Sequence, residues 1–235
     1  MFDVKYPSTF HLRKGAGRGD PANGLCFMET AAYIMGEPIT DHPECACPVL
    51  TSYGIFLNDS MPDDARQRLL PLAVAVAGTR SPDHMKRRVE ILGRGAVRIA
   101  RNVQPPNPDA RVSAALDAAD AYWNAPSADT AAAADAAAAA AAANAAAAAD
   151  AAAADAADAA NAAYAYAANA AAAAAAAANA AYAADAAGEN SECVWTDAIS
   201  VLREAILAGP HDALGVLAQA RVDEVAPSLP VRVLG

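Results

Sequence analysis

Three cysteines and a histidine near the start of the chain have the chemistry to bind a metal ion. The segment His42-x-x-Cys45-x-Cys47 offers three ligands, and Cys26 would supply a fourth if a helix brings it beside them. Zinc takes thiolate and imidazole ligands in a close tetrahedral set, so these residue types suit a structural zinc site. The spacing differs from the paired C-x-x-C of common zinc modules. We therefore expect either no cofactor or one structural zinc at Cys26, His42, Cys45 and Cys47.

The same residues also suggest a thiol active site. Cys47 precedes Pro48, which suits the first position of a helix, and a helix N-terminus favours the thiolate. His42 would then act as a general base and Glu29 would orient it. Cysteine is also among the most buried residue types, where it serves as a small apolar side chain. Cys47, His42 and Glu29 are thus candidate catalytic residues of an enzyme or redox protein, beside a purely structural interpretation.

Residues 82–101 form a predicted amphipathic helix with a basic side that could bind anions. Its apolar residues recur at helical spacing and share one face, formed by Met85, Val89, Leu92, Ala96, Ile99 and Ala100. The opposite face holds the candidate anion-binding residues Arg87, Arg94, Arg98 and Arg101. Such a face could contact phosphate groups of a nucleic acid. Because no aromatic residue is interleaved to stack on bases, pairing with acidic residues of this chain or of a dimer partner is favoured.

The charges of the chain are unevenly distributed, and the total is acidic. The net charge is −10, yet residues 80–111 carry eight basic and three acidic side chains. Residues 112–199 carry eleven acidic side chains and no Lys or Arg. The acidic total argues against nucleic-acid binding by the chain as a whole, although the helix over 86–101 keeps it as an alternative. The basic block and the acidic section are expected to attract each other.

Residues 1–104 are predicted to form a compact helical domain that positions these side chains. Helices are expected over about 25–35, ended by Gly36, and from Pro48 onward. Another should start at Asp63 or Asp64 and be broken or kinked by Pro71. The alternation over 72–78 suits a short strand, although its flanks favour a helix. The proline-rich linker 103–109 closes this domain.

The section 110–188 is an alanine-rich, low-complexity arm. Residues 131–187 contain no Gly or Pro, and alanine has the highest helix propensity. One helix over 128–187 would be about 90 Å long. A hairpin with a turn near Asp155 to Asn161 is equally compatible with the sequence. The remaining residues, 189–235, are expected to form a short helical tail that packs on the rest. The fold class is therefore all-α: a compact N-terminal helical domain plus a long helix or helical hairpin.

The arm is expected to contact protein rather than membrane. Residues 159–184 are uncharged, but alanine is nearly neutral in transfer and three asparagines interrupt the stretch. Methyl side chains let helices approach closely, which favours a protein partner or self-association through the arm. The first residues lack the apolar core of a secretory signal, and four cysteines make no disulfide framework. A cytoplasmic location is therefore expected.

Several short motifs resemble an uncharacterised family of actinobacterial and actinobacteriophage proteins. The motifs are Cys26-x-Met28-Glu29, Gly36-Glu37-Pro38, Asp41-His42-Pro43-x-Cys45, Cys47-Pro48-Val49 and Asn58-Asp59. The resemblance is close over about residues 7–80 and extends to the arm in composition only, since the arms of those relatives often carry Trp and Arg. It implies the cytoplasm of an actinobacterium or its phage and no established activity. A non-catalytic interaction or scaffold protein is the leading functional hypothesis, because no strong catalytic constellation accompanies the helix-forming arm.

Overall fold

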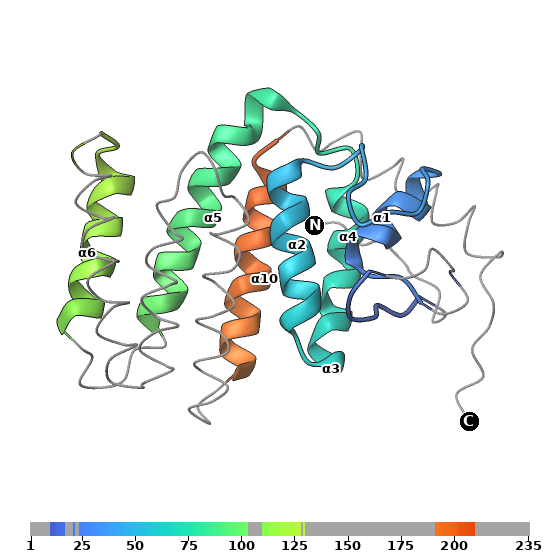
Figure 1. Ribbon diagram of the computed structural model, residues 1–235, viewed down its shortest axis with the longest axis horizontal. Coiled ribbons are helices and arrows are strands. Elements are labelled where there is room, and N and C mark those ends of the chain that lie inside the picture. The colour runs from blue at the N-terminus through green and yellow to red at the C-terminus, as the bar shows by residue number, and fades with distance from the viewer. Residues whose placement is uncertain are drawn as a thin grey trace. The chain divides into compact units, whose positions relative to one another are not determined.

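Every regular element that the structure describes is helical, which confirms the all-α prediction (Figure 1). The computed structural model describes residues 10–16, 21, 24–102, 110–127, 129 and 191–209. Its helices are α1 (Phe27–Met35), α2 (Pro48–Ser60), α3 (Asp63–Arg66), the 3-10 helix η2 (Gln67–Leu69), α4 (Leu70–Val76), α5 (Pro82–Asn102), α6 (Ala110–Asn124) and α10 (Ser191–Leu207). An isolated parallel bridge pairs Leu12 with Leu25. The linker 103–109 and the predicted helix or hairpin over 128–187 lie outside the described residues, apart from Asp129.

Glycine and proline set most helix boundaries as expected, with one correction at Pro71. Gly36 ends α1 in the left-handed conformation, with φ of 73°, and Pro48 opens α2. Pro71 lies in the first turn of α4, where no intrahelical partner awaits its missing N–H. It therefore starts a helix instead of breaking one, and η2 makes the transition from α3. The alternating residues from 72 to 76 belong to this helix and form no strand.

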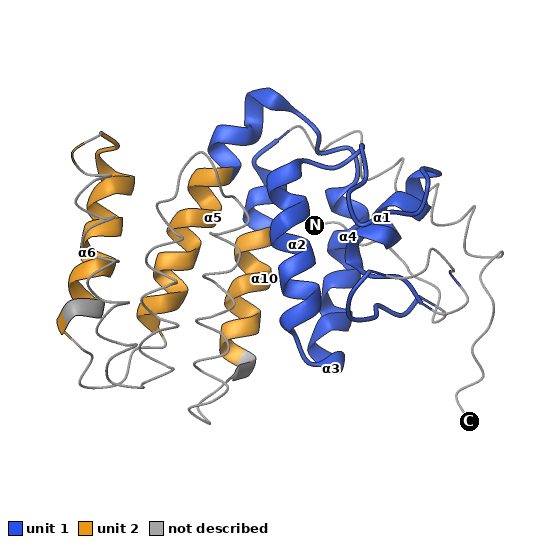
Figure 2. Ribbon diagram, in the orientation of Figure 1, with its two compact units in different colours: residues 1–88, 203–235 blue, residues 89–202 orange. Residues whose placement is uncertain are grey.

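The chain divides into two units, residues 1–88 with 203–235, and residues 89–202 (Figure 2). The division falls inside α5 and inside α10, whereas the sequence suggests one at the linker 103–109. In the first unit, α1 packs against α2 and α4 around a core that includes Phe27, Leu50 and Tyr53. Gly54 of α2 allows this contact, because a Cβ there would lie 2.6 Å from Phe27 Cδ1. This unit holds all the cysteine and histidine candidates.

In the second unit, two glycines of α5 permit close helix packing on two neighbours. A Cβ at Gly93 would lie 2.6 Å from Trp123 Cε2 of α6. A Cβ at Gly95 would lie 2.6 Å from Val201 Cγ2 of α10. Asn102 Nδ2 also donates to Asp197 Oδ2 at 3.2 Å, near the other end of the α5–α10 contact. These glycines, which lower helix propensity, are therefore places where a larger side chain does not fit.

The predicted apolar face of α5 is correct in its centre and wrong at its start. Leu92, Ala96, Ile99 and Ala100 are fully buried, but 41% of Met85 is exposed. Arg88, which the sequence analysis did not place on this face, is 1% exposed. It lies three and four residues from Met85 and Leu92, so helical spacing puts it on the same stripe.

Candidate functional site

Cys26 and Glu29 form a reciprocal cap at the start of α1. The Glu29 backbone N–H donates to Cys26 Sγ at 3.4 Å, and the Cys26 backbone N–H donates to Glu29 Oε2 at 2.9 Å. This is the geometry of a capping box, with cysteine where serine or threonine is usual. Both residues are buried, with exposures of 3% and 2%. The pair thus satisfies two backbone donors that would otherwise be buried without a partner.

Asn58 and Asp59, the other end of the family-like motifs, tie an N-terminal segment to this cap. Asn58 Oδ1 accepts the Phe27 backbone N–H at 3.1 Å, and its Nδ2 donates to the Arg13 carbonyl at 2.9 Å. Asp59 Oδ1 accepts the Gly15 backbone N–H at 2.8 Å. The motif residues Cys26, Glu29, Asn58 and Asp59 therefore share a structural task, which is to fix the chain around the first turn of α1.

Cys47 lies at the position that was expected to activate its thiol, but it is buried. It precedes Pro48 at the N-cap of α2, and its side chain makes no capping hydrogen bond. The residue is 1% exposed, and its backbone N–H donates to Thr79 Oγ1 at 3.0 Å. A substrate could not reach this thiol without movement of the surrounding side chains. Cys47 thus lies at a helix N-terminus as predicted, but its side chain is not accessible from the surface.

His42 and Cys45 lie in the loop between α1 and α2, and each has its own acidic neighbour. His42 is exposed, with Nδ1 at 2.8 Å from Asp41 Oδ1. Burial, and then the nearby Glu37 carboxylate, raises the pKa of the Cys45 thiol to about 11. Burial, with a further contribution from Glu29, raises the pKa of the Cys26 thiol to about 12. Both thiols are therefore protonated near neutral pH.

The four predicted zinc ligands are not gathered into one site. Within the described ranges, no group of three or more His, Cys, Asp or Glu side chains is placed to hold a metal ion. Cys26 Sγ is used as a hydrogen-bond acceptor at α1, whereas zinc requires a thiolate. Glu29, the proposed orienting residue, binds the Cys26 backbone and not the His42 ring. We find no geometric support for a metal centre or for a Cys47–His42–Glu29 triad in this part of the chain.

Two of the four candidate anion-binding arginines pair with α6. Arg101 Nη2 contacts Asp117 Oδ1 at 2.7 Å and Asp120 Oδ2 at 2.6 Å. Partial burial lowers the pKa of Arg101, but the hydrogen bonds to both aspartates outweigh it and raise the pKa overall. Arg94 donates to Asn124 Oδ1 at 2.9 Å and to the Trp123 carbonyl. The expected attraction between the basic block and the acidic section is therefore present at Arg101.

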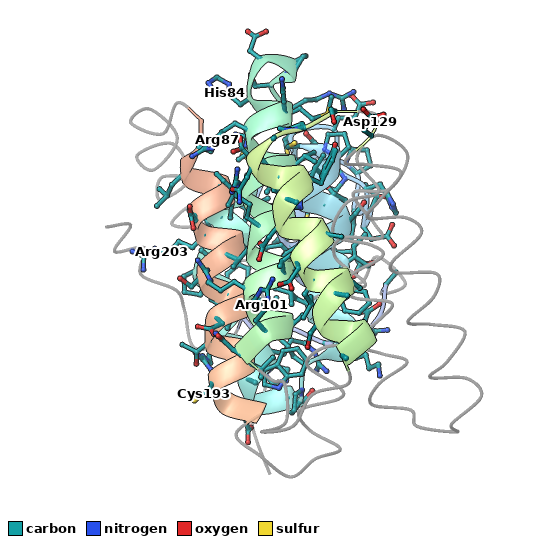
Figure 3. All side chains as sticks on the ribbon, turned by 90° about the vertical axis from the view of Figure 1, so that its left-hand side faces the viewer. His84, Arg87, Arg101, Asp129, Cys193 and Arg203 are labelled. Carbon is teal, nitrogen blue, oxygen red and sulfur yellow. The ribbon has the colours of Figure 1, made fainter. Side chains whose placement is uncertain are left out.

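The other two arginines, Arg98 and Arg87, are exposed on α5. A view of all side chains places Arg87 near the start of that helix (Figure 3). The predicted basic face is thus divided: Arg94 and Arg101 contact α6, whereas Arg98 and Arg87 are exposed at other positions on α5.

Sequence reasoning missed a buried polar cluster at the start of α5. Arg88 donates through Nε to the Ala205 carbonyl of α10 at 3.3 Å and through Nη1 to the Thr79 carbonyl. One turn earlier, Ser81 Oγ and His84 Nδ1 are 2.8 Å apart. The available signals were the position of Arg88 on the apolar stripe and the i, i+3 spacing of a serine before a helix. Both interactions fix the start of α5.

None of the helices in the described part of the chain combines the length and apolar character that a membrane crossing needs. Comparison with protein-family models, with curated proteins and with solved structures finds no match to this chain. The resemblance to the actinobacterial and phage family therefore stays a prediction from motifs whose residues have structural roles here.

Proposed function

We propose that this chain is a non-catalytic, α-helical interaction protein whose helical body presents an acidic, alanine-rich segment to a protein partner. One observation carries the proposal: the candidate thiols Cys26 and Cys47 and the candidate orienting residue Glu29 are buried within the helical body. Cys26 and Glu29 form the cap of α1, and Cys47 is buried at the start of α2. A surface-mediated role is therefore better supported than one that depends on a reactive thiol.

The composition of the arm supports a binding role. Residues 131–187 carry five aspartates and no Lys or Arg, and most of the other side chains are methyl groups. If the segment is helical, as its alanine content predicts, its methyl side chains let a partner helix approach closely, and its aspartates are distributed around the helix. The residues that flank it, Trp123 of α6 and Val201 of α10, both pack on glycines of α5. Helix α5 thus holds the two helices that precede and follow the segment.

Photo-crosslinking in cells tests this proposal. A photoreactive amino acid replaces Tyr166 in the arm in one variant and exposed Asn124 at the end of α6 in a matched control. We expect discrete crosslinked species that are specific to position 166, because the arm is the surface offered to the partner. Equal crosslinking at both positions, or none at position 166, would contradict the proposal.

Nucleic-acid binding through α5 is the alternative with a specific residue set, namely Arg87, Arg94, Arg98 and Arg101. The pairing of Arg94 and Arg101 with α6 argues against it, because those groups would have to exchange intramolecular partners for phosphates. A mobility shift of duplex DNA at low salt that is lost in Arg98→Glu would favour this alternative over the interaction role.

A further inference from the structure

We propose that residues 10–16 act as a built-in peptide ligand of this chain, docked on the first unit and able to leave it while the helices stay folded. We call this segment the strap. Its docking surface, the backbone-reading site, is defined by Leu25, Asn58, Asp59 and Gln67. The strap and the site both belong to the first unit and are separate from the alanine-rich segment, so the inference goes beyond the proposed function.

Gln67 binds both backbone groups of one strap residue. Its Oε1 accepts the Leu12 backbone N–H at 2.8 Å, and its Nε2 donates to the Leu12 carbonyl at 2.9 Å. Within a sheet, a residue of a neighbouring strand would form the same pair of hydrogen bonds. The Gln67 amide therefore takes the place of a strand edge, and its two hydrogen bonds do not depend on which side chain position 12 carries.

The other contacts of the backbone-reading site also go to the main chain of the strap. Asn58 Nδ2 donates to the Arg13 carbonyl at 2.9 Å. Asp59 Oδ1 accepts the Gly15 backbone N–H at 2.8 Å, and the Arg13 backbone N–H donates to the Leu25 carbonyl at 3.0 Å. Five backbone groups of the strap are therefore bound by the body. Main-chain hydrogen bonds of this kind supply the affinity when an extended peptide adds to a strand edge.

One strap side chain is fully buried, and it is Leu12, with an exposure of 0%. His11, Lys14 and Ala16 are exposed. His11 Nε2 lies 3.8 Å from Asp63 Oδ2, but both side chains are largely open to solvent, so this ion pair contributes little. The backbone-reading site should therefore select an extended backbone with one leucine and tolerate changes at the exposed positions.

Asn58 is shared between the body and the strap. It is 0% exposed, and its Oδ1 accepts the Phe27 backbone N–H at 3.1 Å while its Nδ2 donates to Arg13 in the strap. The Nδ2 atom also donates to Asp59 Oδ1 at 2.9 Å. A buried donor that loses its acceptor carries the full cost of desolvation. The orientation of this buried amide toward the strap therefore favours occupation of the site by an extended backbone.

The strap has the features of a segment that opens locally. It contributes one fully buried apolar side chain, whereas the core of the first unit includes Phe27, Leu50 and Tyr53. Four of its five hydrogen bonds to the body end on side chains, and one ends on a backbone carbonyl. Regions with few buried apolar contacts open at a lower free energy than the core does. We therefore expect the strap to detach while α1 and α2 remain folded.

Peptide binding to the full chain tests the inference. The probe is a fluorescently labelled peptide of residues 10–16 with blocked ends, and the readout is anisotropy. Leu12→Ala in the chain should release its own strap, so the peptide should bind this variant at least about tenfold more tightly than the wild type. The matched control Lys14→Ala changes an exposed strap residue and should bind the peptide within about twofold of the wild type. Circular dichroism establishes that each variant is folded.

Further variants identify both sides of the interaction. Leu12→Ala/Gln67→Ala in the chain should bind the peptide at least about tenfold more weakly than Leu12→Ala alone, because the site loses its two contacts with one residue. A peptide with His11→Ala and Lys14→Ala should bind as the original does, within about twofold, and a peptide with Leu12→Ala should not bind. Absence of binding to a folded Leu12→Ala chain, or equal binding to that variant and to the wild type, overturns the inference.

Hydrogen exchange on the wild type decides the matter if Leu12→Ala does not fold. The backbone amides of Leu12, Arg13 and Gly15 should exchange as a group and at least about tenfold faster than the amide of Leu57 in α2. Exchange of the strap as slow as that of Leu57 would mean that it opens only when the body unfolds, and the inference would be wrong. Neither measurement involves position 166, so the proposed function is tested separately.

Discussion

Cys26 and Glu29 show how residues with reactive chemistry can serve the backbone. The spacing C-x-x-E is the spacing of a capping box, with a sulfur atom in place of a hydroxyl. That spacing alone indicates such a cap, whereas the neighbouring histidine and cysteines suggest metal and thiol chemistry instead. Whether the cysteines and the histidine come together in one site depends on contacts between segments that are distant in the sequence. One such contact is the Asn58 bond to Phe27, which local patterns do not reveal.

Substitutions of Glu29 measure how much its hydrogen bond to the Cys26 backbone contributes to stability. Glu29→Ala should destabilise the protein by about 1–3 kcal/mol, because the buried Cys26 N–H loses its acceptor. Glu29→Gln should cost less, since glutamine also serves in capping boxes. Urea unfolding followed by circular dichroism gives both values. Equal stability of Glu29→Ala and wild type would show that water replaces the lost carboxylate.

The raised pKa of the Cys26 thiol predicts that the folded protein loses stability in alkaline solution. Burial and Glu29 raise its folded-state pKa to about 12, above the ordinary value of 9.0. The folded state therefore holds this proton more tightly than the unfolded chain does. The resulting stabilisation is complete below about pH 9 and is lost as the pH rises through the folded pKa.

The Cys26→Ser variant is the matched control, because serine keeps the cap without a thiol. The difference in free energy of unfolding between wild type and Cys26→Ser should fall between about pH 9 and 12. A pH-independent difference would mean that the thiol is ionised as easily in the folded state as in the unfolded chain.

Thiol reactivity gives an independent test at the residue scale. Cys193 is exposed, whereas Cys26 and Cys47 are buried and Cys45 has a pKa raised to about 11. In native protein near pH 8, a disulfide reagent should react with Cys193 first, and Cys193→Ser should remove the fast phase. A fast phase that survives in Cys193→Ser but disappears in Cys47→Ser would revive the thiol-enzyme hypothesis.

At the scale of elements, α5 was predicted well and its contacts were not. Helical periodicity identified its length and the buried centre of its apolar face. Helical periodicity does not show where a neighbouring helix ends. It therefore assigned Met85, which is exposed, to the core and omitted Arg88, which is buried. Likewise, Gly93 and Gly95 were expected only to weaken the helix. Their packing role depends on Trp123 and Val201, which lie 30 and 106 residues further along the chain.

Gly95→Ala measures that packing role. On propensity alone, alanine should stabilise the helix by about 1 kcal/mol. The added Cβ would lie 2.6 Å from Val201 Cγ2, so we expect a net destabilisation of about 1–3 kcal/mol instead. Adding Val201→Ala should recover part of that loss in a double-mutant cycle. Stabilisation by Gly95→Ala alone would show that α10 can shift away at little cost.

At the scale of the whole molecule, the all-α class was predictable because caps, prolines and helical periodicity agree throughout the described residues. The conformation of the arm stays a prediction. Solution scattering can distinguish its two forms, because a continuous helix over 128–187 would be about 90 Å long and a hairpin about half of that. A disordered arm would instead give a scattering profile typical of a flexible chain, and circular dichroism would then show little helix beyond the described elements.

The anchoring of Trp123 and Val201 on neighbouring glycines of one helix has an evolutionary consequence. The repetitive stretch joins α6 to α10, and both helices are clamped on α5, so a change in its length need not disturb them. For a flexible connection between two fixed ends, the entropy cost of closure rises by only about 0.6 kcal/mol for each doubling of its length. Replication slippage could therefore lengthen or shorten the alanine tract over generations while the clamp keeps the surrounding helices in register.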